Sequence, residues 1–565
     1  MIRRLVFPTL AATTLAAVNA AVLPLPAAPV PPEPRRTTWP MFGGAHARNM
    51  VNSTDRGVPD GFDPETGAGI LWKADLGSAS YTQPVVAGGR VYVGTNNQRP
   101  RNPRDTRVNP VTGETEPIDR GVLMCFDQRN GKFLWQAVHD KLASGQVNDW
   151  PNVGIGSAPA VEENRVYYVS NRAEVVCADA NGLLDGNQGF QREQYQDETD
   201  ADVLWSFDMI GELKVFPHNL ASCSPLVVGD AVFVVTGHGV DENHLNIPRP
   251  ETPSFIALDK TTGKLLWKDN SPGKNIMHGQ WGIPSYAAEP VPQVIFPGGD
   301  GWLRAFEPKT GKLLWKFDGN PKDAKYELGG TGTRSDFVNV APVIANGRVY
   351  VGMGQDPEHA TGIGHLWCID LKKAVEFGAK NKDADVSPAG NDFDPAAAAN
   401  RTSALAWHFG GEDKRQGATR DFIYGRTLSC ACAVGDVVYA AELDGLIHCL
   451  DARTGKRYWV YDTKAVIWNS PFAADGKVFL AAESDLFVFK HQPKPDVFAD
   501  PDDVRAAGLN RREMRQALRD LTRQFEDKVL VRKVELPAPC RATPAVAGGV
   551  LYLNTENTLY AIGTK

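Results

Sequence analysis

Thr262-Gly263-Lys264-Leu265-Leu266-Trp267 occurs in this chain as one of several close copies. The others are Thr310-Gly311-Lys312-Leu313-Leu314-Trp315, Thr454-Gly455-Lys456-Arg457-Tyr458-Trp459 and, without the threonine, Gly131-Lys132-Phe133-Leu134-Trp135. A motif that returns at intervals of tens of residues indicates one supersecondary unit that is copied and stacked. The other landmarks of the unit therefore predict the architecture.

Each unit begins with a proline, which is followed by a short apolar run, a turn and a second apolar run. The residues that align before this turn are Pro84, Pro159, Pro225, Pro284, Pro342, Pro471 and Pro544, with Ala431 in the same position once. A representative second run is Gly347-Arg348-Val349-Tyr350-Val351. A Gly, Asn or Asp turn before β-branched and aromatic residues predicts a β-hairpin.

The rest of the unit supplies two more strands. A third strand ends with a small residue, an apolar residue and an acid, as in Ala257-Leu258-Asp259, and the fourth strand carries the tryptophan. Four strands in a bare unit of about 40 residues are typical of a propeller blade. The aligned residues predict eight such blades.

The two ends of the chain predict a closed ring. The unit that begins at Pro544 lacks a fourth strand, whereas residues 69–73 form a surplus fourth strand before the first proline. Pairing these segments would complete the eighth blade and remove exposed sheet edges. We therefore predict an all-β, eight-bladed β-propeller of four-stranded antiparallel blades. A solenoid of hairpins is the alternative, although a solenoid has no use for a split terminal repeat.

The signature Ala-x-Asp-x-x-Thr-Gly-Lys-x-x-Trp, here Ala257 to Trp267, resembles the tryptophan-docking repeat of eight-bladed propellers that are similar to pyrroloquinoline-quinone (PQQ) proteins. The resemblance covers residues 69–565. The family includes quinoprotein alcohol dehydrogenases and BamB-type outer-membrane assembly factors. It implies that the tryptophans brace neighbouring blades. It leaves the function open, because one scaffold serves enzymes, binders and assembly factors.

The N-terminus predicts export. Arg3 and Arg4 precede a largely apolar run, and Val18-Asn19-Ala20 offers small residues for cleavage, so we expect a signal peptide over residues 1–20. Residues 21–68 are predicted to be a proline-rich linker and N-terminal extension, and residues 69–565 the propeller, with a helical insertion at 492–527. No later segment is long and apolar enough to span a bilayer. The mature protein is therefore expected to be periplasmic or secreted.

Charge and cysteine content narrow the possible functions. The net charge is −7, from 60 basic and 67 acidic residues, and no long basic run is present, so nucleic-acid binding is not expected. Four of the eight cysteines, Cys125, Cys177, Cys368 and Cys449, occupy one equivalent position in different blades, too far apart for disulfides. We interpret these cysteines as small buried hydrophobic residues.

Residues just before each aligned proline are predicted to line the mouth of the central channel. Three positions upstream lie Tyr81, Gly156, Ser222, Trp281, Asn339, Leu428, Trp468 and Arg541. With neighbouring residues these give the candidate ligand-binding set Trp281, Trp468, His278, Gln280, Asn339, Asp336, Arg541 and Arg426. The alternative is a solvated funnel that Trp281 and Trp468 plug.

Two functions are compatible with such a channel. In the resembled dehydrogenases PQQ lies between a tryptophan and a vicinal disulfide, calcium polarises the quinone, and an aspartate acts as the base. This chain has no adjacent cysteine pair, and Asp336 is the one carboxylate that the repeat places near the axis. We therefore favour an exported binding or assembly scaffold for a protein, peptide or glycan partner. A PQQ- and calcium-dependent alcohol or sugar dehydrogenase is the alternative.

Two further groups could hold a metal. Residues 179–187 have the Asp, Asn and Gly content of a calcium loop, with Asp179, Asn181 and Asp185 as candidate ligands, but they lack the spacing of an EF-hand. Residues 355–359, together with His365, gather metal-capable side chains without a recognisable ligand spacing. A polar loop is the simpler interpretation of the second group.

Overall fold

The structure of the protein is a computed structural model that describes residues 38–330, 332–356, 358, 362–415 and 418–564. All of these residues belong to one compact unit, Pro32–Lys565. The predicted signal peptide and the first part of the predicted linker lie outside the described residues, as do Pro357 and His359 of the second candidate metal group.

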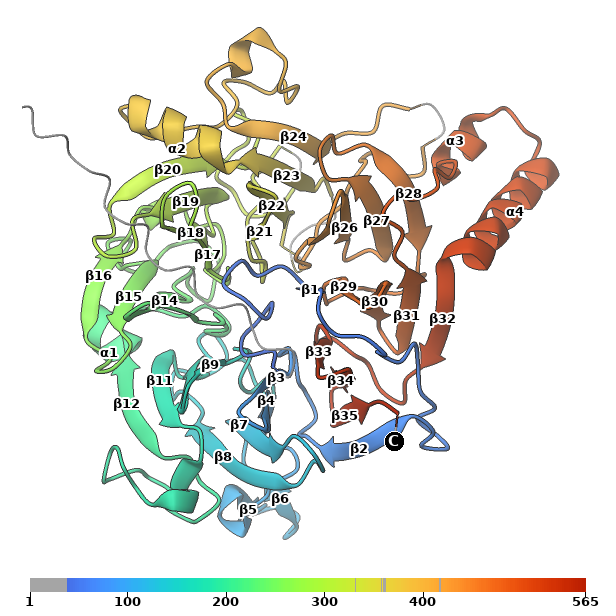
Figure 1. The fold of residues 1–565 in the computed structure, drawn as a ribbon. Helices are drawn as coiled ribbons and strands as arrows, with labels where there is room; N and C mark the ends of the chain where they lie inside the picture. Colours follow the sequence, from blue (N-terminus) through green and yellow to red (C-terminus); the bar gives the residue numbers. More distant parts are fainter. Residues whose placement is uncertain (1–37, 331, 357, 359–361, 416–417, 565) are drawn as a thin grey trace, which may run out of the picture. The chain divides into compact units, whose positions relative to one another are not determined.

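The described residues form eight four-stranded antiparallel sheets arranged radially in a ring, which confirms the predicted eight-bladed propeller (Figure 1). From the axis outward, blades one to four are β3(Val85–Ala87), β4(Arg90–Asn96), β7(Arg120–Asp127) and β8(Phe133–Asp140); β9(Ala160–Glu162), β10(Arg165–Val169), β11(Glu174–Asp179) and β12(Val203–Asp208); β13(Leu226–Val228), β14(Ala231–Val235), β15(Phe255–Asp259) and β16(Leu265–Asp269); and β17(Ser285–Ala287), β18(Gln293–Pro297), β19(Trp302–Phe306) and β20(Leu313–Asp318).

Blades five to eight repeat this order. They are β21(Val343–Ala345), β22(Arg348–Met353), β23(His365–Asp370) and β24(Leu405–Gly410); β25(Cys432–Val434), β26(Val437–Ala441), β27(Leu446–Asp451) and β28(Arg457–Asp462); β29(Phe472–Ala474), β30(Lys477–Ala482), β31(Asp485–Lys490) and β32(Leu530–Glu535); and β33(Ala545–Ala547), β34(Val550–Asn554), β35(Thr558–Ile562) and β2(Ile70–Asp75). In blade seven the short strand β1(Val51–Asn52) adds to β29 in parallel.

The ring closes as the split repeat predicts. β2 pairs antiparallel with β35, with Trp72 opposite Ala561 and Lys73 opposite Tyr560. β2 therefore covers the outer edge of the sheet that β33, β34 and β35 form, so this edge is not left open.

The repeated motif couples neighbouring blades. Five indole N–H groups donate to a turn carbonyl of the next blade at 2.8 to 3.1 Å: Trp72 to Gln128, Trp135 to Ala180, Trp205 to Lys260, Trp267 to Pro308 and Trp407 to Ala452. The glycine of the same turn lies under the ring, because a Cβ on Gly263 would be 2.5 Å from Trp205. Its φ of +71° also favours glycine. The motif thus sets the distance between blades.

Residues 38–58 run along the inner strands of all eight blades, and this segment is drawn in blue near the centre of Figure 1. It forms hydrogen bonds with every blade. From blade one to blade eight the bonded pairs are Trp39 with Val86, Pro40 with Val161, Arg48 with Pro225, His46 with Tyr286, Ala47 with Ile344, Asn49 with Ala433, Met50 with Ala473 and Asn52 with Val546. We call residues 38–58 the axial segment. It contacts the inner strands over one end of the ring axis.

Arg48 anchors the axial segment. Its side chain is fully buried, and its guanidinium donates to the carbonyls of Phe42 (2.8 Å), Pro284 (2.9 Å) and Pro225 (2.9 Å). No carboxylate among the described residues lies within ion-pair distance of it, and burial lowers its pKa to about 10. Backbone carbonyls therefore take the place of a counter-charge.

Insertions between the blade strands add further short elements. They contain the hairpin of β5(Thr106–Val108) and β6(Thr115–Pro117), the helices α1(Met209–Leu213), α2(Leu371–Lys380), α3(Pro501–Ala506) and α4(Arg511–Val529), and the 3-10 turns η1(Pro103–Asp105), η2(Gly182–Asp185), η3(Gly273–Asn275) and η4(Ala398–Asn400). Asn510 caps α4 with a capping box.

The apolar stripe of α4 is only partly buried. Phe525 is buried and stacks on Tyr461 of blade six at a centroid distance of 4.9 Å, whereas Met514, Leu518 and Leu521 are half-buried. The helix therefore docks through its C-terminal end and extends outward beyond β28 and β32 (Figure 1).

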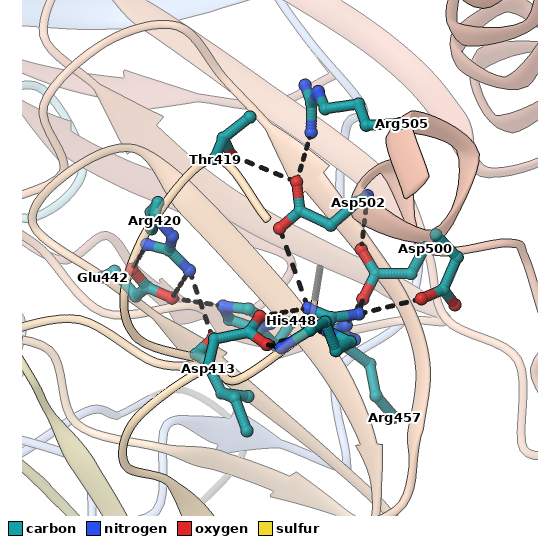
Figure 2. A network of polar contacts seen from close by, with 12 residues as sticks. Asp413, Thr419, Arg420, Glu442, His448, Arg457, Asp500, Asp502 and Arg505 are labelled. Carbon is teal, nitrogen blue, oxygen red and sulfur yellow. Dashed lines mark hydrogen bonds and ion pairs between the residues drawn. The ribbon is translucent and has the colours of Figure 1, made fainter. Parts of the chain in front are cut away.

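A charged network fixes α3 to blade six (Figure 2). Asp500 accepts hydrogen bonds from Arg415 and Arg457, and it also caps α3 through the backbone N–H of Asp502 (3.0 Å). Thr419 donates to Asp502 at 3.1 Å. The loop after β24 and the helical insertion of blade seven thus share one set of ion pairs.

All eight cysteines are buried and none is bonded to another. Burial raises the pKa of their thiols, for example of Cys177 to about 12, so they remain protonated and apolar. Among the residues that the structure describes, every helix is too short or too polar to cross a bilayer.

Candidate functional site

An axial cavity of about 310 Å³ lies at the centre of the ring. Eight of its lining residues each lie four residues before the first strand of a blade, in the segment that enters that blade: Tyr81, Gly156, Ser222, Trp281, Asn339, Leu428, Trp468 and Arg541. These are the eight positions that the repeat alignment selects. Their role in binding a ligand remains a prediction.

Two tryptophans form aromatic walls of the cavity. Trp281 is buried, and its indole N–H is shared between the carbonyls of His218 (3.2 Å) and Leu220 (3.1 Å). Trp281 packs in a small apolar cluster with Leu428, and half-buried Trp468 packs against this cluster. Both rings line the cavity and leave its volume open.

Arg541 brings a positive charge to the wall. Its guanidinium lies 5.3 Å from the ring centroid of Trp468 and 5.6 Å from that of Tyr81. It also donates to the hydroxyl of Tyr81 (3.2 Å) and pairs with Glu556 (3.1 Å). The cation is therefore oriented by aromatic faces and balanced by one carboxylate.

Two asparagines add polar groups. Asn219 and Asn339 both have left-handed backbones, with φ of 59° and 55°, and both line the cavity. The Ser222 hydroxyl donates to the side-chain oxygen of Asn339 at 3.4 Å. Amide side chains can both donate and accept hydrogen bonds, which suits a ligand with hydroxyl or peptide groups.

The floor of the cavity includes the axial segment. Phe42 lines the cavity beside Gln83. The Gln83 side chain accepts from the N–H of Gly43 (2.8 Å) and donates to the carbonyl of Pro544 (2.9 Å). This bridge joins the axial segment to blades one and eight.

Three of the predicted residues do not line the cavity. Gln280 is buried, where it donates to Ser254 (2.8 Å) and accepts from the N–H of Gly299 (2.8 Å). Asp336 is buried next to β22, where burial and the nearby Asp356 raise its pKa well above the usual value. Arg426 forms an ion pair with Asp444 at 3.4 Å. Through these contacts Gln280, Asp336 and Arg426 help to hold the loops in place.

His278 and two acids complete the cavity wall. His278 is buried and its Nδ1 lies 2.9 Å from a carboxylate oxygen of Asp356. Asp356 and Glu358 both line the cavity. The sequence places these acids in a polar loop after a blade-five strand, and no repeat position signals that the loop reaches the axis.

The predicted calcium ligands Asp179, Asn181 and Asp185 lie away from the cavity, at the end of β11 and in η2. Asp179 accepts from the backbone N–H of Asn181 (2.7 Å) and from the side chain of Asn164 (2.5 Å). The side chain of Asn181 donates to Asp185 at 2.8 Å. Protein donors thus contact both Asp179 and Asp185.

The cavity offers few groups for the quinone of PQQ itself. PQQ carries three carboxylates, whereas Arg541 is the one arginine or lysine among the described lining residues, and it is already paired with Glu556. Asp356 and Glu358 are carboxylates of the kind that calcium takes as ligands, and without calcium between them they would repel an anionic quinone. No cysteine lines the described part of the cavity, so the vicinal disulfide of the resembled dehydrogenases has no counterpart there.

A family model described as "Outer membrane protein assembly factor BamB" matches residues 119–376 and 396–492, which is more than half of the chain. The chain belongs to this family. The resemblance to PQQ-like propellers that the repeat signature indicates is thereby confirmed.

Shorter stretches are similar to curated dehydrogenases. One stretch of 107 residues is 35% identical to a polyvinylalcohol dehydrogenase of Sphingopyxis sp. (strain 113P3) and covers 18% of this chain and 16% of the relative. Another, of 101 residues, is 43% identical to the dehydrogenase subunit of a quinone alcohol dehydrogenase of Gluconobacter oxydans (strain 621H) and covers 17% and 13%. The matches therefore span less than a fifth of either relative.

Solved structures with a similar fold include BamB from Moraxella catarrhalis, with a TM-score of 0.48 and 12% identity over 87% of this chain and 99% of that one. A europium-containing methanol dehydrogenase has a TM-score of 0.49 and 12% identity over 94% and 99%.

Proposed function

We propose that this protein is an exported binding or assembly propeller that holds a protein, peptide or glycan partner at the mouth of the axial cavity. The observation that carries the proposal is the cavity itself. It combines aromatic walls, amides and one balanced arginine, and its described lining residues include no cysteine pair and no second basic side chain for a quinone.

The size and chemistry of the cavity favour a protruding group of a partner. A volume of about 310 Å³ admits a few side chains or a sugar ring and excludes a folded domain. Tryptophan faces such as Trp281 and Trp468 provide large apolar contact area, and the nearby amides can bond hydroxyl or peptide groups. A peptide loop or a glycan chain offers both kinds of surface.

The family description favours a protein partner. It names an assembly factor of the outer membrane, and this supports both export and a scaffold role for this chain. The insertions provide further contact surface around the cavity, since loops carried on a rigid ring commonly bind partners.

A PQQ-dependent alcohol or sugar dehydrogenase is the second candidate. The names of the two curated relatives favour it, because both are dehydrogenases and one uses a quinone. The lining residues argue against it, since a single paired arginine does not suit a tricarboxylate and no described lining residue is a cysteine, although Asp356 and Glu358 could hold calcium.

A binding screen tests the proposal. Untagged mature protein is applied to a random peptide display library and to a glycan array, in parallel with Trp468→Ala and with Trp302→Ala. Trp302 is also half-buried, but it bonds Tyr326 at 3.0 Å and does not line the cavity. We expect peptides or glycans that bind the wild type and Trp302→Ala but lose at least tenfold affinity with Trp468→Ala. Ligands that bind all three proteins equally would contradict a role for the cavity.

A further inference from the structure

Three histidines from three separate loops meet beside the axial cavity. His218 precedes β13, His244 lies between β14 and β15, and His278 precedes β17. One ring nitrogen from each lies within 4.8 Å of those of the other two. The ring centroids are 4.4 to 4.7 Å apart and the rings are inclined by 54° to 71°. The imidazoles therefore surround one point and do not stack.

Two of the rings are held in a defined orientation through Nδ1. His218 Nδ1 donates to the backbone carbonyl of Val240 at 2.8 Å, which fixes the proton on Nδ1 and the lone pair on Nε2. His278 Nδ1 lies 2.9 Å from Asp356. Hydrogen bonds from the remote nitrogen to a carbonyl or carboxylate are the usual support of metal-binding histidines. The same contacts assign Nε2 as the ligand atom of both residues.

The cluster leaves a polar atom that needs a partner. His218 is 1% exposed, and its Nε2 bonds to none of the described residues. A buried acceptor without a partner destabilises the folded protein. Because the Nδ1 proton bonds the Val240 carbonyl, the lone pair of Nε2 is the one available to a metal ion. Neutral imidazole is the form that binds a metal ion.

We propose that His218, His244 and His278 bind one divalent transition-metal ion of the kind that prefers imidazole, such as Zn²⁺, with Asp356 and the Val240 carbonyl as positioning groups. Zinc–nitrogen bonds of about 2.0–2.1 Å in a tetrahedron require nitrogens about 3.4 Å apart. Small rotations of the rings bring the nitrogens to that spacing from within 4.8 Å.

The metal site borders the axial cavity. His278, Asp356 and Glu358 line the cavity, so an ion held by the three histidines would lie in its wall. Three protein ligands leave a fourth position for water or for a donor group of a ligand, as in zinc sites that are open to solvent. The metal site is independent of the proposed function, because it does not require that the cavity bind a partner.

Metal titration tests this inference. The untagged protein is treated with a chelator, desalted and titrated with Zn²⁺ by calorimetry, and Co²⁺ is then used as a visible-absorbance probe. We expect one equivalent of Zn²⁺ and the visible bands of tetrahedral cobalt. His244→Ala, at a half-exposed loop position, should weaken Zn²⁺ binding at least 100-fold and abolish the cobalt bands. Asp356→Asn should weaken binding by about 10- to 100-fold.

The control is His491→Ala, which removes a half-buried histidine that pairs with Tyr439 outside the cluster and should leave Zn²⁺ binding unchanged. Thermal unfolding of each variant without metal checks that it is folded, and added Zn²⁺ should raise the midpoint of the wild type but not that of His244→Ala. The inference is overturned if the wild type binds no stoichiometric Zn²⁺ or Co²⁺, or if His244→Ala retains the affinity of the wild type.

Discussion

The glycine of each Gly-Lys-x-x-Trp turn that docks a tryptophan is required for two separate reasons. Its backbone has a positive φ, and in the docked turns a tryptophan of the preceding blade occupies the space of a side chain. The two reasons can be separated, because other turns of the ring share the backbone conformation without the tryptophan. Gly263 and Gly476 both have φ of +71°, but only Gly263 has atoms within 4 Å of an added Cβ.

We therefore predict that Gly263→Ala destabilises the protein more than Gly476→Ala does. Gly476→Ala should cost about 1–2 kcal/mol, the penalty for a left-handed alanine. Gly263→Ala should cost a further ~1–3 kcal/mol, because its methyl group displaces Trp205. Denaturant unfolding monitored by tryptophan fluorescence measures both. Equal losses would show that the tryptophan contact does not set the spacing of the blades.

Arg48 is the second residue on which the fold depends. Arg48→Met removes a buried guanidinium that bonds carbonyls of the axial segment and of blades three and four. We predict a loss of roughly 3–5 kcal/mol, because those buried carbonyls keep no donor. Arg56→Ala, in the same segment but at an exposed position, should change stability by less than about 0.5 kcal/mol. Thermal and denaturant unfolding measure the stability of both variants. Similar losses of stability would show that Arg48 does not anchor the axial segment.

At the level of elements, the helical insertion of blade seven depends on the ion pairs of Asp500 (Figure 2). Burial alone would raise the pKa of Asp500, but the charges of Arg457 and Arg415 outweigh it, and the pKa is lower in the folded protein. A lowered carboxyl pKa contributes stability above the unfolded pKa, and this contribution is lost as pH falls through the folded value. Docking of α3 should therefore weaken in acid.

We predict that Asp500→Asn increases hydrogen exchange in α3 at pH 7, with a cost of about 1–3 kcal/mol from the lost charged hydrogen bonds. The difference from the wild type should shrink as pH falls below the ordinary aspartate value of 3.8. Asp503→Asn is the matched control, since Asp503 pairs with the same Arg415 but is 64% exposed. A difference that is the same at pH 7 and pH 3 would show that charge is not what fixes the helix.

Some elements could be predicted from the sequence and others could not. Repetition predicts the blades, the closing strand and the eight cavity positions, because each equivalent residue points to the same axis. The axial segment gives no such signal, since residues 38–58 have no repeat and bond a different blade every few residues. His244 and Asp356 lie in unique loops, so only the folded ring brings them to His278.

On the scale of the whole molecule, the ring, the axial segment and the cavity are parts of one connected structure. Tryptophan docking fixes the blades, the segment bonds the inner strand of each blade, and the entry segments of all eight blades form one wall. Such a rigid ring suits binding, because a preformed pocket loses little entropy when a partner binds.

We propose that this cavity binds a partner and not a quinone. Reconstitution tests this proposal: the purified protein is incubated with PQQ and calcium, desalted, and assayed for quinone absorbance and for dye-linked oxidation of alcohols. We predict that no stoichiometric quinone is retained and that no turnover appears. Retained quinone with alcohol oxidation would contradict the account and establish the dehydrogenase in its place.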